Sequence, residues 1–182
     1  MGMTQLSIKK AFMLIEPGPV VLVTTNDGNR NNIMTITWHM VMDFTPRIAL
    51  TTGSWNHSFE ALMRTKECVI AIPTVDLAEK TVRIGAVSGT EVDKFKEFGL
   101  TPLAAETVKA PLIAECLACL ECHLIDYIEP YGILILEGKH AWIDSERKEH
   151  RTFHANGDGT FVVDGETLDY RSLMEDKLPE GV

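Results

Sequence analysis

The chain has 182 residues, the length of about one domain, so residues 1–182 are expected to form a single domain. Hydrophobic residues make up 45% of it, which is enough to bury a core without disulfide or metal support. The formal net charge of −9 would repel a phosphate backbone and argues against nucleic acid as a partner, although one small phosphate could still find a local basic pocket.

The N-terminal residues 1–23 contain apolar stretches broken by Lys, Glu and Pro, without the core of a signal peptide. No stretch of the chain approaches the roughly 18–20 consecutive apolar residues of a membrane span. Four cysteines are too few for a secreted disulfide scaffold of this length. We therefore expect a cytoplasmic protein with no membrane partner.

Strand patterns dominate the first half. Residues 20–25 and 33–42 are predicted strands, joined by a turn over 26–32 whose Asp-Gly pair is a strong hairpin signal. Residues 47–53 and 68–73 are rich in β-branched and apolar side chains and predict two further strands.

Three short helices are predicted between and after these strands, at residues 54–67, 76–85 and 90–99. Asp76 is a candidate N-cap for the second helix. Gly99 is placed to end the third helix in a left-handed conformation.

The second half contains a predicted strand at 132–144 and a hairpin within 154–170, where two Asp-Gly turns flank an apolar run. Residues 112–128 could be helical or extended. Together these elements predict a mainly β fold with short α insertions, in which a mostly antiparallel sheet closes as a barrel.

The run NNIMTITWHMVMDF, residues 31–44, has an unusual composition for a core strand. Alternate residues of a strand face opposite ways. One predicted face is apolar and polarisable, with Met34, Ile36, Trp38, Met40 and Met42. The other begins apolar and then carries hydroxyls, with Ile33, Thr35, Thr37, His39 and Val41. A planar heteroaromatic ligand suits this mixture, but so does an ordinary half-buried strand whose threonines favour β structure.

A second candidate region, TTGSWNHS at residues 51–58, joins a strand end to a helix start. Free N–H groups at such a helix start, with hydroxyls beside them, can bind phosphate. An ordinary capped helix, with Ser54, Asn56 or Ser58 as N-cap, explains the same residues. Lys94, in SGTEVDKF, could add a positive charge or could be a solvated surface lysine.

Four segments occur in an order and spacing that resemble flavin reductase-like proteins of the flavoredoxin type: NNIMTITW, TTGSWNHSFEALMRTKECVIAIPT, SGTEVDKF and GDGTFVVDGETLDY. The resemblance runs from about residue 8 to 175. It implies an FMN-binding split β-barrel, usually a homodimer with each flavin site near the subunit interface.

The resemblance also implies roles for individual residues. The isoalloxazine ring would be lined by Asn32, Thr35, Ile36, Thr37 and Trp38, with the main chain of Ile36 and Thr37 at its pyrimidine edge. The ribityl phosphate would be cradled by Thr52, Gly53, Asn56, His57 and Ser58. Lys94 would neutralise the phosphate or polarise the N1/C2=O edge of the flavin, and Phe161 would approach the ring from the C-terminal hairpin of its own chain or of the partner. Relatives often have Arg or a second Thr in the phosphate loop, and some have a His near Tyr131; this chain departs from both patterns.

The three cysteines of Cys116-x2-Cys119-x2-Cys122 could share a helix face and bind a metal. In a strand, Cys119 would face away from the other two, and Cys116 and Cys122 would stand ~20 Å apart at ~3.3 Å per residue. We favour structural thiols, treat His150 and His154 as surface histidines, and expect no metal ligands.

The functional expectation is an FMN-dependent oxidoreductase, either an NAD(P)H:flavin reductase or a flavoredoxin-like electron-transfer protein. NAD(P)H or a reduced protein would supply the electrons. No catalytic side chain is expected, because the cofactor carries the redox chemistry. Two alternatives remain: a non-catalytic FMN electron carrier reduced by a partner protein, and a split-barrel protein that binds haem or another ligand without flavin.

Overall fold

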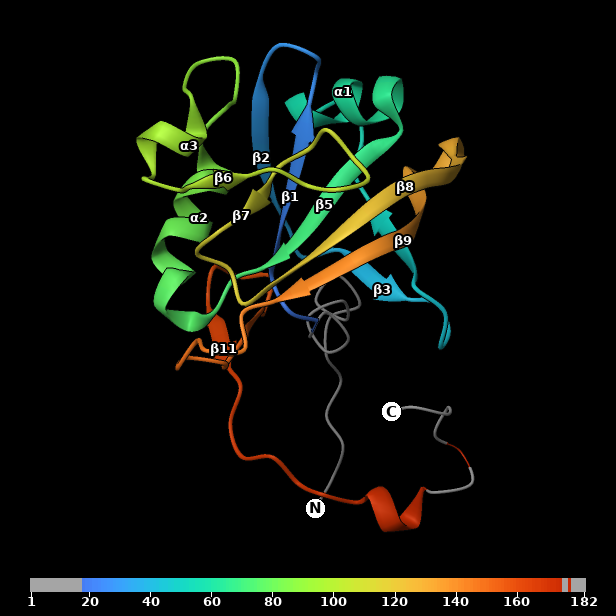
Figure 1. Ribbon diagram of the computed structural model, residues 1–182, viewed down its shortest axis with the longest axis vertical. Helices are drawn as coiled ribbons and strands as arrows, with labels where there is room; N and C mark the ends of the chain where they lie inside the picture. Colours follow the sequence, from blue (N-terminus) through green and yellow to red (C-terminus); the bar gives the residue numbers. More distant parts are fainter. Residues whose placement is uncertain (1–17, 175–176, 178–182) are drawn as a thin grey trace.

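The computed structural model describes residues 18–174 and Lys177, and its centre is one antiparallel sheet of seven strands (Figure 1). Its strands are β1 (Val21–Asn26), β2 (Asn31–Ile36), β3 (His39–Val41), β4 (Arg47–Thr51), β5 (Glu67–Ile72), β8 (Ala118–Ile128) and β9 (Ile133–Ile143). They lie in the order β2-β1-β5-β8-β9-β4-β3. Two separate two-stranded sheets pair β6 (Pro102–Leu103) with β7 (Leu112–Ile113), and β10 (Phe153–Ala155) with β11 (Phe161–Val163).

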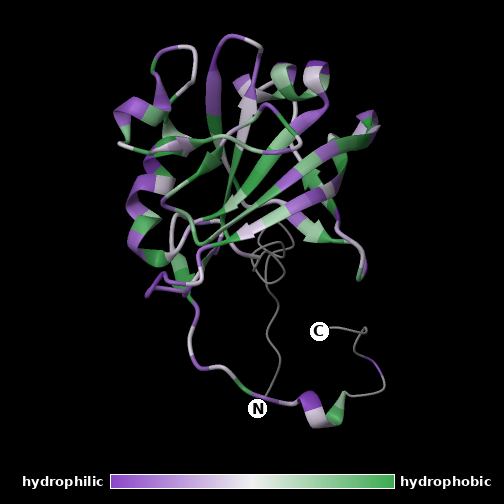
Figure 2. Cartoon of the chain, viewed as in Figure 1, coloured by the Kyte–Doolittle hydropathy of each residue, from purple (hydrophilic) through white to green (hydrophobic). Residues whose placement is uncertain are grey.

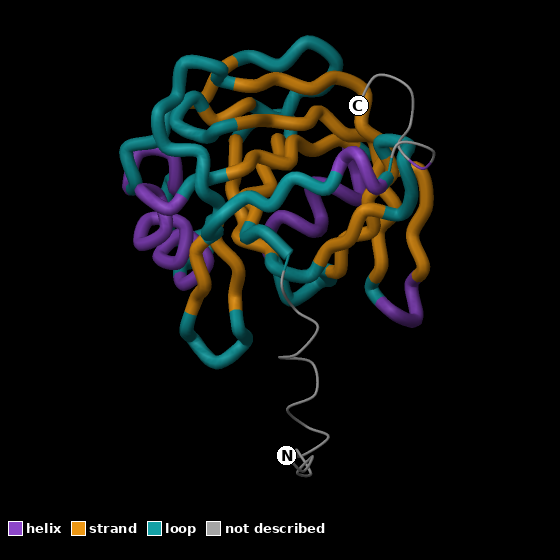
Figure 3. The backbone as a smooth tube through the Cα atoms, turned by 90° about the horizontal axis from the view of Figure 1, so that it is seen from below, coloured by secondary structure: helices purple, strands orange, loops and turns teal. Residues whose placement is uncertain are grey.

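The two outermost strands, β2 and β3, are consecutive in the chain and are separated only by Thr37 and Trp38. The edges of the sheet therefore meet at this point, and the strands curl round as Figure 3 shows. The predicted mainly β fold with short helices, a split barrel, is confirmed.

The prediction of one continuous strand over 33–42 is wrong. β2 ends at Ile36, and β3 begins at His39. The interruption has a geometric cause, because the chain stops pairing with β1 and starts pairing with β4 at the opposite edge of the sheet. Side-chain alternation cannot run unchanged through that corner.

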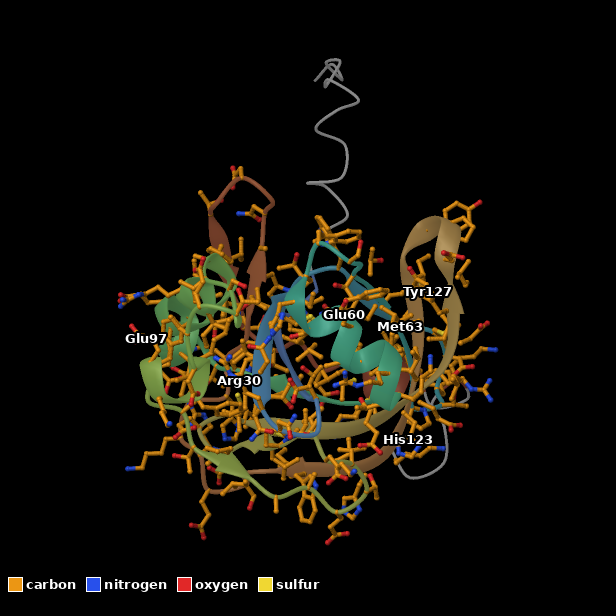
Figure 4. The ribbon with its side chains drawn as sticks, turned by 90° about the horizontal axis from the view of Figure 1, so that it is seen from above. Arg30, Glu60, Met63, Glu97, His123 and Tyr127 are labelled. Atoms are coloured by element: carbon orange, nitrogen blue, oxygen red, sulfur yellow. The ribbon has the colours of Figure 1, made fainter. Side chains whose placement is uncertain are left out.

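Three α-helices are present in the described residues: α1 (His57–Thr65), α2 (Ala78–Ala86) and α3 (Lys94–Glu97). Short 3-10 turns are η2 (Val75–Leu77), η3 (Glu129–Tyr131) and η4 (Arg171–Leu173). α1 lies on the concave side of the curled sheet, as seen from above in Figure 4. α2 and α3 lie outside the sheet, next to β2 (Figure 1).

Two details of the predicted helices need correction. Asp76 does not cap α2; it lies within η2, where its carboxylate accepts a hydrogen bond from the Thr74 hydroxyl and pairs with Arg147 at 2.8 Å. The third helix is shorter than predicted, because it begins only after Asp93, whose side chain accepts from the Lys96 N–H. Gly99 follows it with φ +55°, as predicted.

Apolar side chains are buried on both faces of the sheet. The inner cluster includes Leu50, Leu134 and Leu136 of the sheet together with Leu62 of α1. The outer cluster packs the sheet against α2, α3 and the loop that follows. β2 contributes to both, with Ile33 in the outer cluster and Met34 and Ile36 in the inner one. Figure 2 shows the resulting hydrophobic colour along the central strands.

Residues 112–128 take the extended alternative and form β7 and β8. All four cysteines are free and buried. Cys122 lies opposite Cys68 in the β5–β8 register, whereas Cys116 packs in the same cluster as Cys119. We expected Cys116 and Cys119 to face opposite sides of one strand, and this is wrong. Cys116 precedes β8, so strand alternation does not apply to it.

Within the described residues, no group of three or more His, Cys, Asp or Glu side chains could hold a metal ion. The helices of this same part of the chain include none that is long and apolar enough to cross a membrane.

Candidate functional site

The two segments singled out in the sequence, β2 with its following corner and the loop before α1, run side by side. At one end the Asn32 side-chain amide donates to the Ser58 hydroxyl at 2.9 Å. At the other end the Thr51 N–H donates to the Trp38 carbonyl at 2.9 Å. The two segments therefore lie side by side within a single chain.

Local hydrogen bonds shape the start of α1. Asn56 is its N-cap: the side chain accepts from the Ser58 N–H at 3.3 Å, and its own N–H donates to the Gly53 carbonyl at 2.9 Å. Of the three candidate N-caps, Asn56 is the one that caps the helix: its backbone is extended, and the helix begins at the next residue.

A cleft of about 320 Å³ opens between β2, the start of α1 and the connection from α2 to α3. We call it the central cleft. It brings together four of the predicted site residues, Thr35, Asn56, His57 and Lys94. Its other lining residues are Met34, Trp55, Gly85, Ala86, Val87, Ser88 and Gly89.

Glycines allow the end of α2 and the connection to α3 to lie directly against β2. A Cβ added at Gly89 would stand 2.2 Å from the Asn32 side-chain oxygen, and one at Gly85 would stand 3.2 Å from Thr35 Cβ. A side chain at position 89 would therefore displace the Asn32 side chain and its hydrogen bond to Ser58.

Lys94 is the most unusual residue in the central cleft, because its side chain is only 5% exposed. Its ammonium donates to the Ile33 carbonyl at 2.8 Å and to the Ile84 carbonyl at 2.9 Å. Ile33 lies in an outermost strand, and Ile84 lies in the last turn of α2, where the helix dipole favours a cation. Lys94 thus tethers α3 to both elements.

Burial lowers the pKa of Lys94 to about 8. Among the described residues, no carboxylate lies within ion-pair distance of this ammonium. The central cleft therefore holds a buried cation that main-chain carbonyls satisfy only in part, and an anionic or strongly polar ligand would complement it.

The remaining β2 residues have structural contacts of their own. The Thr35 hydroxyl donates to the Thr81 carbonyl at 2.7 Å and so holds β2 to α2. The Ile36 side chain is buried in the inner cluster, which leaves only its main chain available to a ligand. Thr37 lies at the corner between β2 and β3.

Some predicted site residues do not line the central cleft. Thr52 is buried, and its N–H donates to the Gly132 carbonyl at 3.0 Å. Gly53 lies beneath the Trp55 ring, which would be 2.1 Å from a Cβ at that position. Trp38 is 56% exposed, and Phe161 lies on β11, packed edge-on against Phe153. One chain therefore assembles only part of the predicted site.

Gly53 and Trp55 also line a second depression of about 630 Å³, which we call the aromatic groove. Its other large side chains are Phe59, Met63, Tyr127, Pro130 and Tyr131. Trp55 lines both the central cleft and the aromatic groove, so the two are neighbours.

Sequence reasoning missed Trp55 and the stretch Gly85–Gly89 as lining residues of the central cleft. Trp55 stands inside the TTGSWNHS segment, and Ser88 and Gly89 open the SGTEVDKF segment. For these three residues the signal was therefore in the quoted motifs, whereas residues 85–87 lie outside them. Which of these residues face the cleft depends on how α2 packs against β2.

Comparison with known proteins identifies the family. The family model described as the flavin reductase like domain matches residues 13–161, and the chain belongs to this family. The uncharacterized protein YddH of Escherichia coli (strain K12) is 30% identical over 183 residues, which cover 90% of this chain and 95% of YddH.

Solved structures agree with this assignment. The flavoredoxin of Desulfovibrio vulgaris (Miyazaki F) is 25% identical, with a TM-score of 0.81 over 93% of this chain and 96% of the flavoredoxin. An FMN-binding domain of a flavin reductases-like enzyme from Shewanella baltica OS155 is also 25% identical, with a TM-score of 0.77 over 91% of this chain and 96% of that domain. The resemblance read from the four sequence segments is confirmed.

Proposed function

We propose that this protein is an FMN-binding oxidoreductase and that FMN occupies the central cleft. The observation that carries the proposal is Lys94, a buried ammonium at a cleft wall without a carboxylate partner among the described residues. Membership of the flavin reductase like domain family supports the redox class. The names of the two similar structures, a flavoredoxin and an FMN-binding domain, support the choice of cofactor.

The donor set fits a phosphorylated flavin. In the central cleft Lys94 offers a positive charge, and Asn56 and His57 offer polar groups at a helix start. The paired segments offer main-chain groups for a ring edge. When bound, FMN would supply hydride and electron transfer. The protein's own residues would bind it, orient it and exclude water from one side.

We propose NAD(P)H or a reduced protein as the electron donor. The aromatic groove supports access by a planar molecule, because it adjoins the central cleft through Trp55 and is lined by aromatic rings. If no pyridine nucleotide reduces the protein, the non-catalytic carrier with a protein donor becomes the preferred function.

We also propose a homodimer. Large apolar side chains at and after the corner of the sheet are exposed: Trp38 56%, Met40 60%, Val41 69%, Met42 44% and Phe44 80%. Large exposed apolar side chains gathered in one short segment are typical of a protein interface. Such an interface could bring Trp38 or Phe161 of a partner subunit to the central cleft. The partner would then supply the predicted site residues that do not line the cleft within one chain. Light scattering should give the mass of a dimer, and Phe44→Asp should lower it to that of a monomer.

The absorption spectrum of the untreated purified protein tests the central proposal. Bound FMN should give a yellow protein with a band near 450 nm, and titration of apoprotein with FMN should reach one per chain. A haem spectrum, or no binding of FMN, would refute it. Stopped-flow mixing with NADH and with NADPH then separates the enzyme, which bleaches rapidly, from the carrier, which does not.

A further inference from the structure

A third and smaller cavity, of about 70 Å³, lies beside the central cleft, between the β1–β2 hairpin and one face of α1. We call it the arginine pocket. Arg30 of the hairpin and Arg64 of α1 both line it, and His57 lines both this pocket and the central cleft. Figure 4 shows Arg30 on the hairpin side of α1, where Glu60 also lies.

The two guanidinium groups are only partly satisfied. Arg30 donates to the Val92 carbonyl at 2.9 Å, and Arg64 donates to the Asp27 carbonyl at 2.5 Å. Neither forms an ion pair with any carboxylate in the described part of the chain. Because a guanidinium has five N–H donors, each arginine keeps donors for a ligand.

Thr25 provides an independent observation that points to a ligand. It lines the arginine pocket and is 0% exposed, and its hydroxyl has no hydrogen-bond partner among the described residues. Buried polar groups in folded proteins almost always have partners. A ligand oxygen in the pocket would supply the partner that the protein lacks.

Two acidic residues also line the arginine pocket and must be weighed against the arginines. Asp27 is engaged in its own turn: its carboxylate accepts from the N–H groups of Asn29 and Arg30, which lowers its pKa. The lowered pKa keeps Asp27 ionised, so its charge and that of Glu60, one helical turn before Arg64, both oppose an anion and stand against the two guanidinium groups.

We propose that the arginine pocket binds one phosphate group, held by Arg30, Arg64 and the Thr25 hydroxyl beside the start of α1. Arginine forks match the geometry of a phosphate, and the helix start favours an anion. The small volume suits a single phosphate rather than a nucleotide. This inference rests on the proposed function, and the phosphate could belong to FMN or to the ribose of NADPH.

The experiment uses the full chain and the variants Arg30→Gln, Arg64→Gln and Thr25→Val. Arg83→Gln is the matched control, because Arg83 lies on α2 and pairs with Glu79 instead. Dissociation constants are measured for FMN and for riboflavin, which lacks the phosphate. Michaelis constants are measured for NADPH and NADH, which differ by one phosphate.

If the phosphate is that of FMN, the pocket variants should bind FMN about tenfold or more weakly and riboflavin unchanged. If it is that of NADPH, FMN binding should be unchanged and only the Michaelis constant for NADPH should rise by about tenfold. Glu60→Gln should act in the opposite direction on the same ligand.

Inorganic phosphate provides a readout that does not depend on flavin. It should raise the melting temperature of the wild type and of Arg83→Gln more than that of Arg30→Gln/Arg64→Gln, with circular dichroism confirming that each variant is folded. A wild type that binds no FMN but shows this difference would refute the proposed function and support the pocket. Pocket variants that match Arg83→Gln in all three assays would overturn the inference.

Discussion

Replacement of Lys94 by Met tests whether the buried charge of Lys94 lowers the free energy of unfolding. The pKa of Lys94 is lowered from 10.5 to about 8 by burial. Each pKa unit corresponds to about 1.4 kcal/mol, so holding this charge in the folded state costs about 3 kcal/mol at neutral pH. The lost hydrogen bonds to Ile33 and Ile84 would offset part of the gain from removing the charge, at about 1–3 kcal/mol.

The pH dependence distinguishes these two effects. Between pH 8 and pH 10.5 the unfolded chain holds the Lys94 proton that the folded apoprotein has released, so the free energy of unfolding should rise with pH across this window. The rise should approach about 3 kcal/mol in the wild-type apoprotein. Lys94→Met should lack it.

Urea denaturation of the apoprotein at several pH values between 7 and 10.5 measures this difference. Lys96→Met is the matched control, because Lys96 is on the same short helix but exposed, paired with Asp93 at the surface. FMN binding should also weaken by about 1–3 kcal/mol in Lys94→Met and not in Lys96→Met. Equal pH slopes in wild type and Lys94→Met would refute the account of a buried, desolvated ammonium, and an unchanged FMN dissociation constant would remove Lys94 from the site.

Three further changes should have distinct outcomes. Gly89→Ala should weaken FMN binding and lower the free energy of unfolding by about 0.5–1.5 kcal/mol, because its Cβ would displace the Asn32 side chain and break its hydrogen bond to Ser58; titration and urea denaturation measure both, and wild-type values would contradict the tight contact. Glu121 is fully buried, and although burial opposes ionisation, hydrogen bonds from Thr107, Glu106 and Trp142 lower its pKa to about 2. The ionised carboxylate should stabilise the fold by about 3 kcal/mol above pH 4.5, and this stabilisation should be lost as the pH falls from 4.5 to 2. Acid unfolding of Glu121→Gln should lack this loss. Replacing Cys116, Cys119 and Cys122 by Ser should leave flavin content intact with some loss of stability, whereas loss of a stoichiometric metal would overturn their structural role.

Many features of the fold could be predicted from the sequence because they depend on near neighbours in the chain. The Asp-Gly turn after β1, the strand at β5 and the stop at Gly99 follow from turn chemistry, β-branched side chains and glycine conformation. The sequence offered three candidate N-caps for α1, and one of them, Asn56, caps the helix. The four segments in order also sufficed to identify the family.

The tertiary structure decided what those local signals could not. The corner at Thr37 and Trp38 exists because β2 and β3 lie at opposite edges of a sheet that closes on itself. The sequence allowed Lys94 to be either a ligand of the flavin or a solvated surface lysine, and the tertiary structure buries it between carbonyls of β2 and α2. Arg30 and Arg64 meet only because α1 packs beside the β1–β2 hairpin. Turns and caps depend on a few adjacent residues, whereas a binding site depends on contacts between residues far apart in the chain, which form only when the sheet curls.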